Sequence, residues 1–177
     1  MIFYYLSCLS GNRDIFMTLK SSFAPLVNAN AQILILGSLP GDLSLIKQEY
    51  YAHPQNRFWK VLFQVHQVNF SASYEIKKQL LSQNHIALWD ICATAFRIGS
   101  MDTDIQHVEA NAIHGLLLEF PNIQKIIFNG KKAQQLYDKH FERLETIQYK
   151  TLPSTSPANA SWNFEKLCTA WEDALSI

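Results

Sequence analysis

Three short runs of uninterrupted apolar residues constrain the fold of this chain more than any other feature. They lie at residues 33–36 (Ile-Leu-Ile-Leu), 86–89 (Ile-Ala-Leu-Trp) and 126–128 (Ile-Ile-Phe). A strand with one face in water alternates apolar and polar residues, whereas a strand covered on both faces does not. The runs therefore predict strands of a mostly parallel sheet with a layer packed on each side.

The segments between these runs have helical spacing of their apolar residues. We expect helices at residues 58–65, 74–84, 108–120, 130–141 and 161–175, and a more exposed strand at 146–149. The helix at 108–120 is interrupted by Asn111 and ends before Pro121. Strands that alternate with helices indicate an α/β domain.

The chain has 177 residues, which is close to the size of one domain. Its 48% hydrophobic and 12% aromatic content excludes a disordered chain. No repeat or linker divides it. We expect residues 17–177 to form a single domain that starts functionally at Met17. Residues 1–16, apolar at first and then broken at residues 11–14, are expected to be an N-terminal extension.

Fifteen Lys and Arg residues balance fifteen Asp and Glu residues. This balance excludes a globally basic nucleic-acid coat, but it allows a local basic cleft. The cysteines, at 8, 92 and 168, are scattered and lack the spacing of a zinc site, an iron–sulfur cluster or a disulfide framework. No segment reaches membrane length. We expect a cytoplasmic monomer with reduced thiols that needs no metal and no cofactor.

Ligands of open parallel sheets bind beyond the carboxyl ends of the strands. Residues 37–44 (Gly-Ser-Leu-Pro-Gly-Asp-Leu-Ser) follow the first run, and their glycines allow a sharp turn close to a ligand. A plain tight turn explains the same pattern. Residues 50–59 (Tyr-Tyr-Ala-His-Pro-Gln-Asn-Arg-Phe-Trp) combine aromatic rings and amides, as a nucleobase pocket requires. Phe58 and Trp59 by themselves are explained as core residues.

Two further segments reach the same edge of the predicted sheet. In residues 128–132 (Phe-Asn-Gly-Lys-Lys) two lysines occupy the first turn of a helix, a place that favours anions. Lysines there are also common as solvated surface. Residues 152–160 (Leu-Pro-Ser-Thr-Ser-Pro-Ala-Asn-Ala) supply hydroxyl and backbone donors for phosphate, or a cap for the next helix.

Together these four segments resemble the uracil-DNA glycosylase superfamily, and most closely its DNA-deoxyinosine (hypoxanthine-DNA) glycosylases. The resemblance runs over residues 22–171, and residues 88–90 and 97–102 also fit that branch. It implies a three-layer α/β/α sandwich with a four-stranded, mostly parallel sheet. It also implies a base-excision-repair enzyme that hydrolyses the N-glycosidic bond of a deaminated base flipped out of DNA.

Two positions depart from the uracil-excising relatives. Those enzymes carry a catalytic Asn in the first loop, where this chain has Leu39, and some carry an Asn where this chain has Leu152. The departures favour hypoxanthine over uracil as the excised base. A mismatch-specific uracil/thymine-DNA glycosylase and a catalytically weak binder of damaged DNA remain as alternatives.

Roles follow for individual residues. Asn56 and Asn129 are the amides left at the sheet edge, and we expect both to be catalytic. His53 can donate to the departing base or serve a structural role before Pro54, and Asp42 can support the sugar cation or the water. The resemblance implies that Tyr51 stacks on the flipped base. The expected base-binding residues are Tyr51, Gly37, Ser38, Leu39, Gly41 and Ser44. The expected DNA-binding residues are Arg57, Lys131, Lys132, Ser154, Thr155, Ser156, Pro157 and Asn159.

Overall fold

A computed structural model describes residues 18–175 of the chain. The expected extension at residues 1–16 and the expected start at Met17 lie outside the described residues. The centre of the fold is a four-stranded sheet in the order β3-β2-β6-β7, in which every neighbouring pair is parallel. Its strands are β2 (Ile33–Gly37), β3 (Ile86–Asp90), β6 (Lys125–Asn129) and β7 (Gln148–Leu152).

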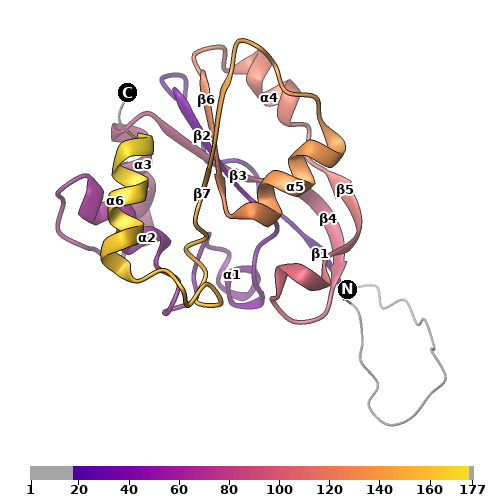
Figure 1. The fold of residues 1–177 in the computed structure, drawn as a ribbon, viewed down its shortest axis with the longest axis horizontal. Coiled ribbons are helices and arrows are strands. Elements are labelled where there is room, and N and C mark those ends of the chain that lie inside the picture. Colours follow the sequence, from indigo (N-terminus) through magenta and orange to yellow (C-terminus); the bar gives the residue numbers. More distant parts are fainter. Residues whose placement is uncertain (1–17, 176–177) are drawn as a thin grey trace, which may run out of the picture.

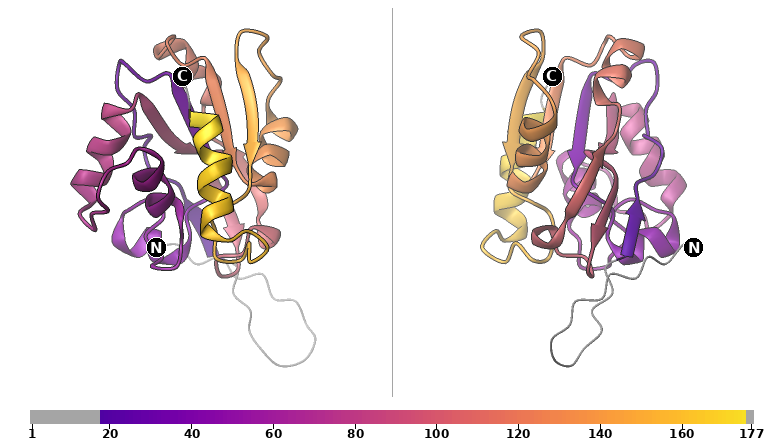
Figure 2. Two further views of the ribbon diagram at one scale, coloured as in Figure 1. Left: turned by 60° about the vertical axis from the view of Figure 1, so that its left-hand side comes forward. Right: turned by 90° about the vertical axis from the view of Figure 1, so that its right-hand side faces the viewer.

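Helices cover both faces of this sheet, as Figures 1 and 2 show. One face carries α2 (Phe58–Val65), α3 (Tyr74–Gln83) and α6 (Phe164–Leu175), and the other carries α4 (Ile113–Glu119) and α5 (Lys131–His140). The strand order explains the division. The chain moves outward in opposite directions from β2 to β3 and from β6 to β7, so right-handed crossovers place α3 and α5 on opposite faces. The predicted three-layer sandwich is confirmed.

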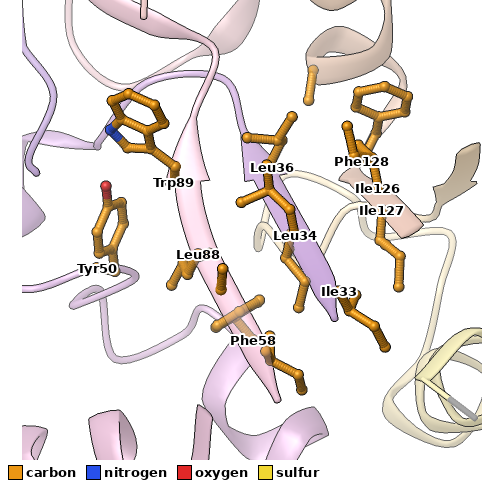
Figure 3. Packing of buried hydrophobic residues seen from close by; sticks show 14 of the residues in the cluster. Ile33, Leu34, Leu36, Tyr50, Phe58, Leu88, Trp89, Ile126, Ile127 and Phe128 are labelled. Carbon is orange, nitrogen blue, oxygen red and sulfur yellow. The ribbon is translucent and has the colours of Figure 1, made fainter. Parts of the chain in front are cut away.

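The core lies where the apolar runs meet the helices. All residues of β2 and β3 are buried. Figure 3 shows Leu34 of β2 with Leu88 of β3 on one side and Ile126 of β6 on the other. The absence of alternation in the runs therefore reflects burial on both faces of the sheet.

A second, antiparallel sheet packs beside the first and was not predicted. It contains β1 (Thr18–Ser21), β4 (Cys92–Arg97) and β5 (Gln106–Ala110), in the order β1-β4-β5. The expected helix at 108–120 is wrong in its first part, because residues 106–110 pair with β4 and α4 begins only at Ile113. Pairing with the preceding strand β4 overrode the local helical spacing.

Two other expected boundaries move for local reasons. The last helix begins at Phe164 rather than at residue 161, because Asn163 Oδ1 accepts a hydrogen bond from Lys166 N at 2.9 Å and caps the helix there. The strand expected at 146–149 is β7, which continues to Leu152 because it pairs with β6 over that length. Two short elements complete the described chain: α1 (Asp42–Lys47) and a 3₁₀ turn at Asp102–Asp104. No helix within residues 18–175 is long and apolar enough to cross a membrane.

Candidate functional site

Three of the four segments singled out in the sequence follow strands of the parallel sheet, and the fourth, residues 50–59, is joined to the same edge by hydrogen bonds between Thr155 and the Asn56–Arg57 pair. β2 leads into residues 37–41, β3 ends at Asp90, β6 ends at Asn129 and β7 leads into residues 153–160. Because the strands are parallel and in register, these ends are neighbours. This edge is the candidate functional site.

Asn56 and Asn129, the two amides expected to be catalytic, are joined through one threonine. Thr155 N donates to Asn129 Oδ1 at 2.9 Å, and Asn129 Nδ2 donates to Thr155 Oγ1 at 3.0 Å. Thr155 Oγ1 in turn donates to Asn56 Oδ1 at 3.1 Å. Thr155 is fully buried, so its side chain belongs to this internal chain of hydrogen bonds and is not exposed to DNA.

The hydrogen bonds of Asn56 occupy its amide oxygen and leave its amide nitrogen free to donate. Its Oδ1 accepts from Thr155 Oγ1 and from Phe58 N at 3.0 Å, which occupies both lone pairs of an amide oxygen. Among residues 18–175, no hydrogen bond is formed by Asn56 Nδ2. Asn56 therefore presents an oriented N–H donor, whereas Asn129 is held by Thr155 through both its side-chain oxygen and its nitrogen and lies near the hydroxyl of Tyr51.

Arg57, expected to contact DNA phosphate, points into the protein instead. Its guanidinium donates to the carbonyl oxygens of the last loop: Thr155 O at 3.4 Å, Ser156 O at 2.8 Å, Asn159 O at 3.0 Å and Trp162 O. Asn159 Nδ2 also turns back, to Ser154 O at 2.9 Å. Arg57 thus fixes the shape of residues 155–162 and has little capacity left for a phosphate.

Arg97 holds the first loop in the same manner, and the sequence analysis did not identify it. Its guanidinium is fully buried and donates to Leu39 O at 3.3 Å, to Pro40 O and to Gly99 O at 3.0 Å. The signal available in the sequence was the Arg97–Asp102 segment, in which a cation follows an apolar strand. The half-buried Arg57 and the fully buried Arg97 therefore set the backbone of the last and first loops.

Tyr51 lies at the edge of the site in a conformation that few residues adopt. Its φ is 54°, in the left-handed region. Its ring stacks on Phe58 with centroids 4.0 Å apart and an interplanar angle of 27°. Its hydroxyl is buried and forms no hydrogen bond of normal geometry among residues 18–175, although the side chain of Asn129 lies close enough to act on its pKa. Burial and, second, the charge of Asp90 raise the pKa of Tyr51, so the phenol is neutral.

Several expected base-binding residues support the loops. Ser44 is 5% exposed, and its Oγ accepts from Ala52 N at 3.1 Å, which links α1 to the Tyr51 segment. Ser38 Oγ donates to Asp102 Oδ1 at 2.7 Å. Asp42, which was expected to be catalytic, forms an ion pair with Lys20 at the start of α1. Gly41 lies against Ser100, whose Oγ would be 3.5 Å from a carbon added to the glycine.

The two departures from the uracil-excising relatives are core residues. Leu39 is 6% exposed and Leu152 is 4% exposed. His53 and Lys131 are exposed, and Lys132 is half-buried. The ring of His53 accepts from Gln55 N through Nδ1 at 3.2 Å. In the last loop Pro157 is exposed, and Ser154 and Ser156 are half-buried.

Asp90 is the second residue of the site that the sequence analysis did not assign a role. It is 3% exposed at the end of β3, and its Oδ2 accepts from Ser22 Oγ at 2.8 Å. Burial raises the pKa of Asp90 to about 7, and the charge of Asp102 adds to this, against the hydrogen bond from Ser22 and the charge of Arg97. The sequence signal was an acidic residue that ends an apolar strand.

No group of three His, Cys, Asp or Glu side chains in the described part of the chain could hold a metal ion. Cys92 and Cys168 are free thiols there. What the site offers is a set of neutral hydrogen-bonding groups on a rigid backbone, bordered by the first turn of α5.

Comparison with known proteins agrees with this arrangement. The family model of the uracil DNA glycosylase superfamily matches residues 24–175. A Methanosarcina barkeri protein named hypoxanthine DNA glycosylase is 38% identical over 141 residues, which cover 79% of this chain and 88% of the relative. A Methanosarcina acetivorans protein of the same name is 39% identical over 142 residues, 80% of this chain and 89% of the relative.

The fold agrees as well. The solution NMR structure of a Methanosarcina acetivorans protein, provisionally described as a uracil DNA glycosylase, superposes with a TM-score of 0.76 at 35% sequence identity. The match covers 89% of this chain and 97% of that chain. The sheet edge, its loops and these matches lead to one conclusion: the chain belongs to the uracil DNA glycosylase superfamily.

Proposed function

We propose that this protein excises hypoxanthine from DNA that contains deoxyinosine. Both curated relatives described above carry the name hypoxanthine DNA glycosylase and match most of the chain. The burial of Leu39 and Leu152 supports the same substrate, because apolar core residues stand where uracil-excising relatives have amides.

The reaction is a hydrolysis. The target nucleotide leaves the base stack, which costs a few kcal/mol, and its base enters the site. The bond between C1′ and N9 breaks, and its electron pair leaves with the base. Water oxygen bonds to C1′, and one proton of that water ends on the released base. The enzyme accelerates these steps by stabilising the charge that develops on the base and on the sugar.

The free amide donor of Asn56 is the single observation that carries this proposal. Because Oδ1 is occupied twice, Asn56 Nδ2 is fixed in direction and can donate to an acceptor of hypoxanthine, where negative charge accumulates. A donor fixed before the reaction stabilises that charge without reorganising. Asn129 acts indirectly, as a positioning residue that holds Thr155 against Asn56.

DNA contact is proposed for the first turn of α5 and for the last loop. Lys131 and Lys132 stand where the helix macrodipole already favours phosphate. The loop at 153–160 supplies neutral hydroxyl and backbone donors. We also propose that the protein works as a cytoplasmic monomer, which rests on the sequence alone.

The test is single-turnover excision, with enzyme in excess, on duplexes that carry one deoxyinosine or one deoxyuridine. The wild type should release hypoxanthine in EDTA. Asn56→Ala and Asn56→Asp should both be about 10²–10³-fold slower, because neither keeps the donor. Gln64→Ala removes an exposed amide from α2 and should leave the rate unchanged.

The outcomes test the proposed substrate and the proposed role of Asn56 separately. Release of uracil without hypoxanthine would overturn the substrate. A rate for Asn56→Ala within a few-fold of wild type, with an unchanged circular dichroism spectrum, would overturn the role of this amide.

A further inference from the structure

Asp90 and Tyr51 approach each other over a glycine. Asp90 and Gly37 are register partners at the ends of β3 and β2. A carbon added to Gly37 would lie 2.4 Å from Asp90 Oδ1 and 2.9 Å from Tyr51 Oη. Any side chain larger than hydrogen would therefore push these two oxygens apart. The close approach places two side-chain oxygens at the strand end from which the first loop departs.

The two oxygens of Asp90 have different surroundings. Oδ2 accepts from Ser22 Oγ at 2.8 Å, as either a carboxylate oxygen or the carbonyl oxygen of a neutral acid would. Oδ1 faces Gly37 beside the hydroxyl of Tyr51, which forms no hydrogen bond of normal geometry among residues 18–175. If the acid holds a proton, Oδ1 is the oxygen free to carry it.

The charges around Asp90 do not hold it ionised. Within the described residues it forms no ion pair. The nearby cation, Arg97, is directed at the carbonyls of the first loop and lies 3.8 Å from Asp102. Burial is the main cause that raises the pKa of Asp90, to about 7, and the negative charge of Asp102 raises it further. The ionisable groups that interact with its charge are Asp102, Arg97, Tyr50, Tyr51, Tyr74 and Cys92.

We propose that Asp90 acts as a neutral carboxylic acid that donates a hydrogen bond from Oδ1, beside Tyr51 Oη, to an acceptor atom of the flipped base. This role rests on the glycosylase activity proposed above. When the glycosidic bond breaks, negative charge moves onto the base. A neutral donor stabilises that charge, whereas a carboxylate at the same place would repel it. Asp90 therefore limits excision to the pH range in which it holds its proton.

The test compares the pH dependence of single-turnover excision in the wild type, Asp90→Asn and Asp90→Ala. Asn is the same size as the neutral acid, can accept from Ser22 and can donate toward Gly37, but it does not titrate. The wild-type rate should fall about tenfold per pH unit above the pKa of Asp90. Asp90→Asn should keep its rate across that range, and Asp90→Ala should be about 10²–10³-fold slower at pH 6. Asp173→Asn removes an exposed carboxylate from α6 and should reproduce the wild-type profile.

Three results would each overturn the role of Asp90. They are an alkaline decline of equal size in Asp90→Asn, no decline in the wild type, and full activity of Asp90→Ala at pH 6. Ionisation of the DNA affects all variants alike and cannot mimic the difference. If the wild type excises uracil but not hypoxanthine, the proposed substrate fails, and the same comparison on uracil still tests Asp90. Circular dichroism of each variant detects a folding defect. A ¹³C NMR titration of the Asp90 carboxyl detects whether it holds its proton, independently of the rates.

Discussion

Replacing Arg57 and Lys131 should weaken DNA binding in two different ways. Both are cations at the site, but Arg57 donates to four carbonyl oxygens of the last loop, whereas Lys131 is exposed in the first turn of α5. A lysine that neutralises one phosphate of duplex DNA contributes about 0.9 to the slope of log K against log salt. A cation that is paired inside the protein contributes nothing to that slope.

The magnitudes follow from these contacts. Between 50 and 200 mM salt, one phosphate contact changes affinity by about 3.5-fold. Lys131→Met should remove that dependence and reduce the slope by about 0.9. Arg57→Met should leave the slope unchanged and lower affinity at every salt concentration. Reordering two loop residues on DNA costs about 2–4 kcal/mol, so a loss of affinity of at least about 30-fold is expected.

Fluorescence anisotropy of a labelled duplex, measured across salt concentrations, gives both quantities. Arg57→Lys is the informative control, because it keeps the charge but cannot span four carbonyls. We expect it to bind as weakly as Arg57→Met. A slope reduced by about one in Arg57→Met, or near-normal binding by Arg57→Lys, would refute the assignment of Arg57 to the loop.

Three further predictions concern the group around Asp90. Because its pKa is raised from 3.8 to about 7, the folded state binds the proton more tightly, and stability from this group falls as pH rises from 4 to 7. In urea denaturation, the free energy of unfolding of Asp90→Asn should increase relative to that of wild type by on the order of 4 kcal/mol between pH 4 and pH 8. A difference in unfolding free energy that stays constant over this range would contradict the raised pKa. Gly37→Ala should lower stability by about 1–3 kcal/mol, seen as a lower melting temperature, and an unchanged value would mean that Asp90 and Tyr51 move aside freely. Tyr51→Phe should slow excision at saturating DNA, because the ring already stacks on Phe58 and the hydroxyl lies beside Gly37 and Asp90. A wild-type rate would mean that the ring of Tyr51, and not its hydroxyl, contributes to excision.

The parallel sheet could be predicted because its signal is local. Each apolar run reports its own burial, and the carboxyl ends of parallel strands must meet at one edge. The antiparallel sheet could not be predicted in the same way, since residues 106–110 are strand only through pairing with β4. Their own spacing favoured a helix.

The roles within the site depended on contacts between segments far apart in the chain. Asn56 and Asn129 were recognised from their place in the sequence, and the structure brings both to Thr155. Arg57 was predicted to contact phosphate because the carbonyl oxygens that it binds lie about a hundred residues away in the sequence and leave no local signal. Asp90 gave no sequence signal of its pKa, which arises from burial and from neighbours in other segments of the chain.

The two arginines that hold the loops affect how freely this site can change its sequence. Arg57 and Arg97 hold the last and first loops by their carbonyl oxygens. Every residue type has a carbonyl oxygen, so side chains at the loop tips, such as Pro157 and Ala158, can be exchanged without removing a partner of either guanidinium. Libraries randomised at these tips should therefore yield mostly folded proteins, and altered base or strand preference can be selected on an unchanged backbone.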